Sequence, residues 1–264
     1  MHRDEIDGLR AIEWKDLLPL NRLEILDELS ISLPWLVGSW VAASYDQYLI
    51  ALICSFMFFL TGLRQVHNAY HYALGISRRL TEWVMFGLSI LMLGSMHAIQ
   101  INHLRHHRYC MEEEDVEAMS ARLPGWQAVL IGPLFPLRLH LKAIEVGSRR
   151  QRGWILAELV ANAAWVGLVF GVLEVKWLEY HVVAMAVGQC LTAFFAVWTV
   201  HHDCETERLK ARTIRGRLKA LLTYNMFFHV EHHLFPAVPT CKLDILARRL
   251  NAMVPDLVAK KVFE

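Results

Sequence analysis

Four long apolar stretches constrain the fold of this chain more than any other feature. They occupy residues 31–45, 47–63, 154–173 and 178–200. A helix that crosses a lipid bilayer needs about 20 mostly apolar residues, and these stretches reach or approach that length. Only a few residues separate the two members of each pair. The sequence therefore predicts an all-α integral membrane protein with four transmembrane helices, arranged as two hairpins.

The distribution of basic residues predicts how the hairpins are oriented. Basic residues cluster at 77–79, 148–152 and 208–219, all of which lie outside the hairpins, whereas Lys176 is the only Lys or Arg in the two hairpin linkers. Positive charge marks the cytoplasmic side of a membrane protein. We therefore expect a multi-pass protein with both termini in the cytoplasm.

Two further apolar stretches are predicted to lie along the membrane surface. Residues 83–100 have basic residues on both flanks, so a full crossing would place positive charge on opposite sides. We expect an in-plane or re-entrant helix there. Residues 129–146 interleave apolar residues with Arg138, His140 and Lys142, which is typical of an interfacial helix.

Composition excludes several other classes of protein. The chain of 264 residues is 55% hydrophobic and carries a net charge of +1, so it does not resemble a binder of nucleic acid. Its five cysteines are scattered without a CxxC pair and are expected to be reduced thiols. Residues 1–29 have mixed charge and no early apolar core, so we expect a cytoplasmic amphipathic segment and not a signal peptide. We expect one membrane domain over residues 1–264, with residues 201–264 forming a cytoplasmic cap.

Ten of the fourteen histidines fall into four short groups. The groups are His67 and His71; His103, His106 and His107; His201 and His202; and His229, His232 and His233. Helical residues three and four apart share a face, so the members of three groups should project together. The adjacent pair points in two directions, which leaves open which of the two is a ligand. All four groups adjoin apolar segments on the predicted cytoplasmic side, where returning hairpins would bring them together.

So many imidazoles on one side of a membrane indicate a metal centre. A zinc ion is satisfied by four protein ligands, so ten histidines exceed the needs of one zinc. Imidazole suits iron, copper, nickel and zinc, and two ions with four or five ligands each would use most of the set. Asn225, four residues before His229, is a candidate weak oxygen ligand or a nearby supporting residue. Asp203, Glu205 and Glu231 are candidates to accept the second ring N–H of the liganding histidines.

The remaining polar features have simpler interpretations. His2, His97, His140 and His181 are expected to be packed, hydrogen-bonded histidines and not ligands. The acidic run at 112–115 is predicted to be a solvated loop. The basic run at 208–219 is expected to contact anionic lipid, with docking of an electron donor as the alternative.

The histidine spacing resembles that of the membrane-bound fatty acid desaturase and hydroxylase superfamily. That pattern is HxxxH or HxxxxH, then HxxHH twice, with apolar hairpins between. Here it is His67-x-x-x-His71, His103-x-x-His106-His107 and His229-x-x-His232-His233. The order, the spacing and the long gap before the third box all match, and the resemblance covers about residues 30–250.

The resemblance implies a non-haem di-iron centre in a histidine-box cap on the cytoplasmic face. Two iron ions would be the cofactors and O2 the co-substrate, with the histidines as ligands and no separate catalytic residue. A further histidine at the end of the last transmembrane helix often completes the site in this family, and His201 or His202 occupies that place. Loss of two hydrogens from the substrate gives a double bond, whereas transfer of oxygen gives an alcohol.

The family pattern also implies partners. The chain lacks an HPGG haem-binding signature and any GxG, so neither a fused cytochrome b5 nor a dinucleotide-binding reductase is expected within it. Electrons should come from a separate donor, such as a ferredoxin or a cytochrome b5 with its reductase. The other expected partners are the lipid bilayer and a lipid-like substrate.

Three functions fit these residues. The favoured one is an O2-dependent desaturase acting on a fatty-acyl or similar aliphatic chain. The second is a hydroxylase or ketolase of a lipid, a carotenoid or a small biosynthetic intermediate, which ligand motifs do not distinguish from a desaturase. The third is a non-enzymatic membrane protein that binds haem or metal, for which histidines clustered at i, i+3 and i+4 are poorly suited.

Overall fold

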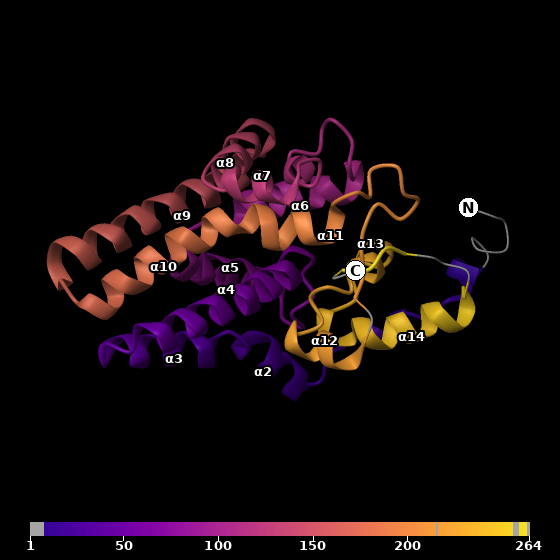
Figure 1. Cartoon of the computed structure of the whole chain (residues 1–264), viewed down its shortest axis with the longest axis horizontal. Coiled ribbons are helices and arrows are strands. Elements are labelled where there is room, and N and C mark those ends of the chain that lie inside the picture. Colours follow the sequence, from indigo (N-terminus) through magenta and orange to yellow (C-terminus); the bar gives the residue numbers. More distant parts are fainter. Residues whose placement is uncertain (1–7, 215, 256–258, 263–264) are drawn as a thin grey trace.

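The computed structural model describes residues 8–214, 216–255 and 259–262. Within them the secondary structure is helical, apart from an isolated bridge between Thr213 and Lys261. Figure 1 shows long helices side by side at one end of the molecule and mostly short helices and loops at the other. The predicted all-α class is confirmed.

Helices of several turns form most of the molecule. They are α2 (Arg22–Ser30), α3 (Leu33–Ser44), α4 (Tyr48–Tyr70), α5 (Arg78–Met92), α6 (Met96–Tyr109), α8 (Leu134–Val146), α9 (Arg149–Leu168), α10 (Lys176–Thr192) and α14 (Leu243–Met253). The short helices are α7 (Gly125–Leu130), α11 (Thr199–His201), α12 (Arg217–Leu222) and α13 (His229–Leu234). Three 3₁₀ turns join them, at Lys15–Leu17, Glu117–Ser120 and Thr240–Lys242. Two segments, η3 (Val169–Leu173) and η4 (Ala193–Trp198), are π-helical continuations of α9 and α10.

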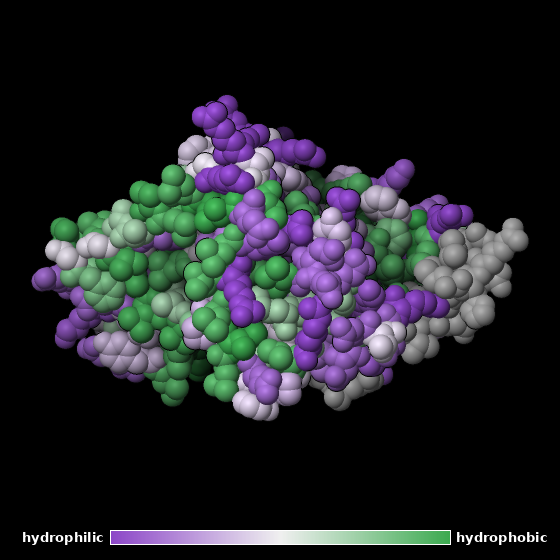
Figure 2. All heavy atoms as spheres, turned by 90° about the horizontal axis from the view of Figure 1, so that it is seen from above, coloured by the Kyte–Doolittle hydropathy of each residue, from purple (hydrophilic) through white to green (hydrophobic). Residues whose placement is uncertain are grey.

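Three continuous helices of the described chain are long and apolar enough to cross a membrane. They are Tyr48–Tyr70, Arg149–Leu173 and Lys176–His201. Exposed apolar side chains line them, among them Leu49, Leu156 and Val183. Figure 2 shows the broad apolar surface over the long-helix end and more hydrophilic surface toward the other end. The several apolar helices fit a membrane protein, as the composition predicts.

The predicted span at 31–45 is shorter in the structure than expected. It forms α3, which has 12 residues and packs along α4. Pro34 lies at the start of this helix, where its missing N–H costs no hydrogen bond. A straight crossing needs about 20 residues, so α3 alone does not reach that length. The arrangement of four spans in two hairpins therefore stays a prediction.

The predicted in-plane or re-entrant stretch is broken in the middle. Helices α5 and α6 meet at an angle of 111° across a short break, which is the geometry of a broken span or a re-entrant loop. Leu93 ends α5 in the left-handed conformation. Ser95 caps α6 by accepting from the Ala98 N–H, and its hydroxyl donates to Glu158 of α9 at 2.5 Å. The bend therefore depends on a buried carboxylate from another helix.

The short helices at the other end share one apolar core with the N-terminal segment. Ile12 and Leu17 pack with Val200, Phe227 and Leu246 in a single buried cluster. Figure 1 shows α14 and α13 lying beside the N-terminal part of the chain. This core holds the segment that carries the last histidine group against the ends of α4, α6 and α11, and so positions the site.

Candidate metal centre

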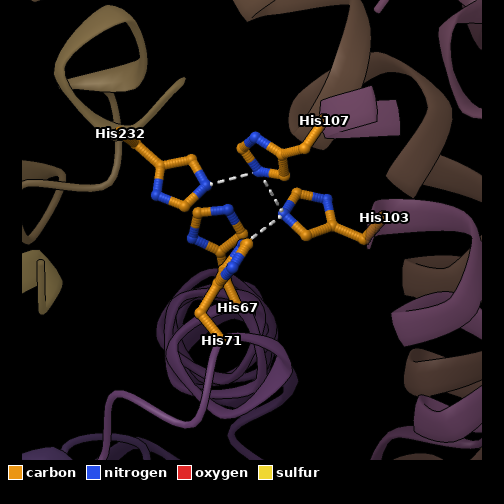
Figure 3. A group of neighbouring side chains, drawn as sticks. All are labelled: His67, His71, His103, His107 and His232. Atoms are coloured by element: carbon orange, nitrogen blue, oxygen red, sulfur yellow. Dashed lines mark hydrogen bonds between the residues drawn. The ribbon is translucent and has the colours of Figure 1, made fainter. Parts of the chain in front are cut away.

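Five histidines from three helices converge on one point. His67 and His71 come from the end of α4, His103 and His107 from α6, and His232 from α13, and one ring nitrogen of each lies within 4.8 Å of the others. Figure 3 shows the five rings facing a common centre. The His103 Nε2 lies 3.0 Å from the His71 Nε2 and 3.1 Å from that of His107, which in turn lies 2.8 Å from that of His232. We call these five residues the first histidine group.

A second group of imidazoles lies beside the first. His106 of α6 places its Nε2 3.0 Å from that of His201 and 3.2 Å from that of His233. His229 lies 2.9 Å from His201 and 3.1 Å from His233 by the same atoms. We call His106, His201, His229 and His233 the second histidine group. The rings of His107 and His233 are 4.5 Å apart between centroids, so the two groups adjoin.

Helical geometry explains how two short boxes supply both groups. On α6, His103 and His107 are four residues apart and face the first group, while His106 is turned toward the second. On α13, the neighbours His232 and His233 point to different groups. An HxxHH box thus contributes histidines to both adjoining groups. The boxes on α6 and α13 face each other, so together they supply most of the histidines of both groups.

Cys110 also lies beside the second group. Its sulfur belongs to a set with ring nitrogens of His106, His201 and His233 in which all the atoms lie within 4.8 Å of one another. Burial is the main reason that the pKa of this thiol is raised to about 12. The thiolate is the form that binds metals, so Cys110 is a weaker candidate ligand than His229.

Acceptors on the outer side of the rings fix how the histidines present their nitrogens. The His106 Nδ1–H donates to Asp115 at 2.7 Å, the His103 Nδ1–H to Glu117 at 3.0 Å, and the His201 Nδ1–H to the Lys210 carbonyl at 2.7 Å. A donating Nδ1 leaves the Nε2 of a neutral imidazole with a free lone pair. The Nε2 atoms of these three histidines are therefore acceptors, that of His103 in the first group and those of His106 and His201 in the second.

Asp115 corrects the prediction that residues 112–115 form a solvated loop. Residues 112–114 are exposed, but Asp115 is buried and accepts from the backbone N–H groups of Met111 and Ala118 as well as from His106. The loop folds back under α6, so its last carboxylate reaches a histidine nine residues earlier. Glu117 is likewise buried, and burial raises its pKa to about 7. The sequence did not predict that Asp115 and Glu117 accept hydrogen bonds from histidines of the site. The available signal was that both acidic residues follow the second histidine box closely in the chain.

The acceptors that the sequence suggested lie elsewhere. The Asp203 carboxylate is largely exposed and lies 3.5 Å from Arg212, and that of Glu205 lies 3.4 Å from Arg122. Glu231 is buried and accepts from the Thr213 hydroxyl at 2.5 Å. None of the three is in contact with an Nδ1 of the two groups among the described contacts. For Asp203 and Glu205, closeness to histidines along the chain goes with side chains that pair with arginines instead.

Asn225 does not share a helical face with His229. Helix α13 begins only at His229, and Asn225 lies in the preceding turn with a left-handed φ of 62°. The spacing of four residues therefore carries no facial relationship here. The side chain borders a surface cavity with Arg217 and Phe228.

His202 is the one histidine of the four sequence groups that lies outside both histidine groups. Its Nδ1 donates to the Trp198 carbonyl at 2.7 Å, and its ring stacks on that of Trp198 with centroids 3.9 Å apart. His201, its neighbour, points inward. The structure thus separates two residues that the sequence does not distinguish.

The other histidines have ordinary hydrogen-bonding partners. The His97 Nδ1–H donates to Glu158 at 2.7 Å, His140 accepts from the Ser95 N–H at 3.0 Å, and the His181 Nε2–H donates to the Leu91 carbonyl at 2.9 Å. None of these three lies in either group. His2 lies outside the described residues.

The geometry of both groups fits metal ions. Two Nε2 atoms, each about 2.1 Å from a shared ion and at roughly a right angle, would be about 3 Å apart. The facing distances of 2.8–3.2 Å match that separation. The His67 Nε2 is buried without a hydrogen-bond partner among the described residues. Burial also holds the pKa values of His229, His232 and His233 well below the usual range, so these rings are in the neutral form that metals bind.

A narrow cavity of about 70 Å³ opens against the histidines. His67, His103 and His229 form part of its wall. The rest is mostly apolar and comes from α4, α6, α8, η4, α11 and the turn before α13, with Leu63, Ile99, Phe135, Phe195, Val200 and Phe227 among the lining residues. A mostly apolar lining with a few polar groups is typical of sites that bind apolar ligands.

The fold and the site together define an all-helical protein with candidate membrane spans and two adjoining polyhistidine clusters that can hold metal. The chain belongs to the fatty acid desaturase family, whose family profile matches residues 46–261.

Three curated relatives are similar to parts of the chain. The sphingolipid delta(4)-desaturase/C4-monooxygenase DES2 of Homo sapiens is 25% identical over 197 residues, which are 69% of this chain and 58% of that protein. The sphingolipid delta(4)-desaturase DES1 of Mus musculus is 25% identical over 63% of this chain and 54% of that protein. The DES2 of Bos taurus is 26% identical over 55% and 47%, respectively. The chain thus spans about half the length of the curated relatives it matches. The names of these relatives describe lipid desaturases, two of which are also monooxygenases.

Proposed function

We propose that this protein is an O2-dependent, non-haem di-iron desaturase that introduces a double bond into a fatty-acyl or lipid-like substrate. One observation carries the proposal: nine inward-facing imidazoles form two adjoining groups, and an apolar cavity opens against both of them. A haem would need one or two axial histidines, not nine converging on two points. Membership of the desaturase family supports the same interpretation.

The two histidine groups would each hold one iron. His67, His71, His103, His107 and His232 would bind the first, and His106, His201, His229 and His233 the second. When bound, the iron pair supplies, with O2 and two electrons, the oxidant that removes hydrogen from an unactivated C–H bond. No catalytic side chain beyond the ligands is needed.

The protein's own residues would hold the ligands and the substrate in place. Asp115, Glu117 and the Lys210 carbonyl keep three histidines in the Nδ1–H tautomer and fix their ring orientation. The walls of the cavity hold an alkyl chain extended beside His67, His103 and His229. They also exclude water from the reacting carbon, which limits side reactions.

Hydroxylation is the second candidate outcome on the same scaffold. The names of two of the three relatives combine desaturase with monooxygenase, so both outcomes occur among similar proteins. Whether a second hydrogen is lost or an oxygen is inserted depends on how the substrate is held at the centre, which the ligands do not determine.

The proposed setting is a single membrane domain over residues 1–264. Four spans in two hairpins would leave both termini and the metal centre on the cytoplasmic side, with residues 1–29 and 201–264 as cytoplasmic parts. Electrons would come from a separate ferredoxin, cytochrome b5 or similar carrier with its reductase.

Metal analysis and product analysis test the proposal. Detergent-purified protein should contain two irons per chain and show no haem absorbance. Incubation with lipids, O2 and a reduced carrier should yield products that have lost two hydrogens or gained one oxygen atom. A haem spectrum, one zinc per chain, or iron-loaded protein that alters no member of a broad lipid set would refute it.

A further inference from the structure

Two side chains with oxygen atoms, Glu117 and Thr192, lie in the otherwise mostly apolar wall of the cavity beside the histidine groups. Apart from the histidines and Tyr70, whose hydroxyl contacts Met96, the polar lining residues are Glu117 and Thr192. Glu117 belongs to the turn after α6, and Thr192 is the last residue of α10 before the π-helical segment η4. The two thus come from separate parts of the chain and meet at one cavity.

One oxygen on each of these residues has no hydrogen-bond partner among the described residues. Glu117 is 9% exposed and Thr192 is 5% exposed. The Glu117 Oε1 accepts from His103, but the Oε2 is buried and unpaired, and so is the Thr192 Oγ1. Burying an unpaired oxygen is unfavourable, so such atoms in a cavity wall indicate a ligand that pairs them.

Two other buried helical threonines, Thr61 of α4 and Thr199 of α11, show that the Thr192 hydroxyl had an alternative partner. The Thr61 hydroxyl donates to the Met57 carbonyl at 2.7 Å, and the Thr199 hydroxyl donates to the Phe195 carbonyl at 2.6 Å. Both use the carbonyl four residues earlier, which is the usual solution in an apolar helix. The Thr192 hydroxyl makes no such bond. It is therefore available to a molecule in the cavity.

We propose that the cavity binds a long-chain lipid with a hydroxyl group near the reacting carbon, and that Glu117 and Thr192 recognise that hydroxyl. This inference rests on the proposed function and names its substrate class. A hydroxyl can donate to one oxygen and accept from the other, which a plain alkyl chain cannot. Because Glu117 hydrogen-bonds a ligand histidine, the recognised hydroxyl lies only a few bonds from the carbon that is oxidised.

The test measures lipid binding and does not require turnover. The probes are long-chain N-methylamides that carry one hydroxyl at successive carbons, each with a deoxy and a methoxy analogue. They are titrated against zinc-loaded protein in nanodiscs. At one hydroxyl position the Kd should be about tenfold lower than for the deoxy analogue, as expected for a hydrogen bond to a buried group. Equal Kd values at every position would overturn the proposal.

Two substitutions at Thr192 separate recognition from packing. Thr192→Val keeps the shape and removes the hydroxyl, so the preference for the hydroxylated lipid should fall several-fold. Thr192→Ser keeps the hydroxyl and should retain the preference. A preference that is equal in both variants would contradict the role of Thr192.

Glu117→Gln gives a signature that a purely structural residue would not. In the variant, the amide oxygen of Gln accepts from His103 in place of the carboxylate. The amide NH₂ then takes the position of the unpaired oxygen and presents an N–H donor to the cavity. The methoxy analogue, which can only accept, should then gain affinity relative to its value with the unmodified protein. No change in the order of the three analogues would contradict the role of Glu117.

The two proposals fail in distinguishable ways. If iron-loaded protein oxidises plain alkyl lipids and binds all analogues equally, the proposed function stands and the substrate class is wrong. If hydroxylated lipids bind more tightly but no lipid is oxidised by iron-loaded protein, the recognition stands and the proposed function is wrong.

Discussion

His201 and His202 are neighbours in the chain with different surroundings. His201 is buried in the second histidine group, whereas His202 stacks on Trp198 at the edge of surface cavities. We expect His201→Ala to lower bound iron sharply and abolish turnover, because it removes a proposed iron ligand. His202→Ala should leave the iron content near that of the unmodified protein. Iron analysis of both purified variants checks this, and equal losses would contradict the assignment.

Asp115 should matter to the metal centre although it is not a ligand. Asp115→Asn places an amide N–H₂ where the carboxylate now accepts from His106 and from two backbone N–H groups. Loss of such an outer partner typically costs about 10–100-fold in metal affinity. Titration with a competing chelator measures the change.

Glu113 provides the control for Asp115. It lies in the same acidic run and is exposed. Glu113→Gln removes the same charge without touching a histidine, so its metal affinity should match that of the unmodified protein. If both variants lose affinity equally, the effect comes from net charge and not from the Asp115–His106 hydrogen bond.

At the scale of elements, Gly132 lets the turn between α7 and α8 approach the backbone of α10 closely. A Cβ at this position would lie 1.9 Å from the Cys190 carbonyl oxygen of α10, and backbone cannot move aside easily. Gly132→Ala should therefore lower the free energy of unfolding by about 1–3 kcal/mol, as overpacked sites do. The midpoint of thermal unfolding in detergent reports the change.

Gly153 in α9 is the matched control for Gly132. A Cβ there meets no atom within 4 Å, so Gly153→Ala should be neutral or slightly stabilising, because alanine favours helix. Similar losses of stability in both variants would show that the contact between Gly132 and Cys190 is not the cause.

The break between α5 and α6 shows which features of an element a sequence reveals. The basic flanks of residues 83–100 predict that this stretch does not cross as a straight helix, and the structure bends it by 111°. The position of the bend was not predictable, because Glu158, which holds Ser95 and His97, lies about sixty residues further along the chain.

At the scale of the whole molecule, a buried ion pair joins the N-terminal segment to α4 and the C-terminal part. Arg64 donates two hydrogen bonds to Glu28, and Asn68 links Glu28 to Thr240. Breaking a buried pair costs about 3–5 kcal/mol, because one charge is left uncompensated. Glu28→Gln should therefore lower the unfolding midpoint substantially and loosen the cap.

The exposed pair between Asp16 and Arg249 is the control. It has a similar two-bond geometry, but solvent screens both groups. Asp16→Asn should change the unfolding midpoint little. If the two variants are equally destabilised, burial does not determine the strength of these pairs.

The proposed orientation in the membrane can be tested with single cysteines. The two variants are Glu174→Cys and Arg149→Cys, each made in protein whose five native cysteines are replaced. Glu174 is between the π-helical end of α9 and the start of α10, and Arg149 is the first residue of α9. An impermeant thiol reagent should label Glu174→Cys in intact cells and Arg149→Cys only after the membrane is opened. Labelling of both from the same side would refute a crossing by α9.

The sequence by itself determined the class of the protein. Long apolar runs predict helices in a membrane, because an unpaired backbone in lipid is prohibitively unfavourable. The spacing of the histidine boxes identified the family, and the structure brings nine of the ten predicted histidines together. Such features depend on residues close in the chain, which is why they can be read without a structure.

Tertiary structure alone decided which groups complete the centre. It turned His201 inward and His202 outward, and it brought Asp115 and Glu117 under the histidines while Asp203 lies beside Arg212. It also formed the cavity that both Glu117 and Thr192 line, although they are 75 positions apart in the chain. Hydrogen bonds and cavities depend on distances between side chains in space, and in this fold those distances are set by how helices from separate parts of the chain pack.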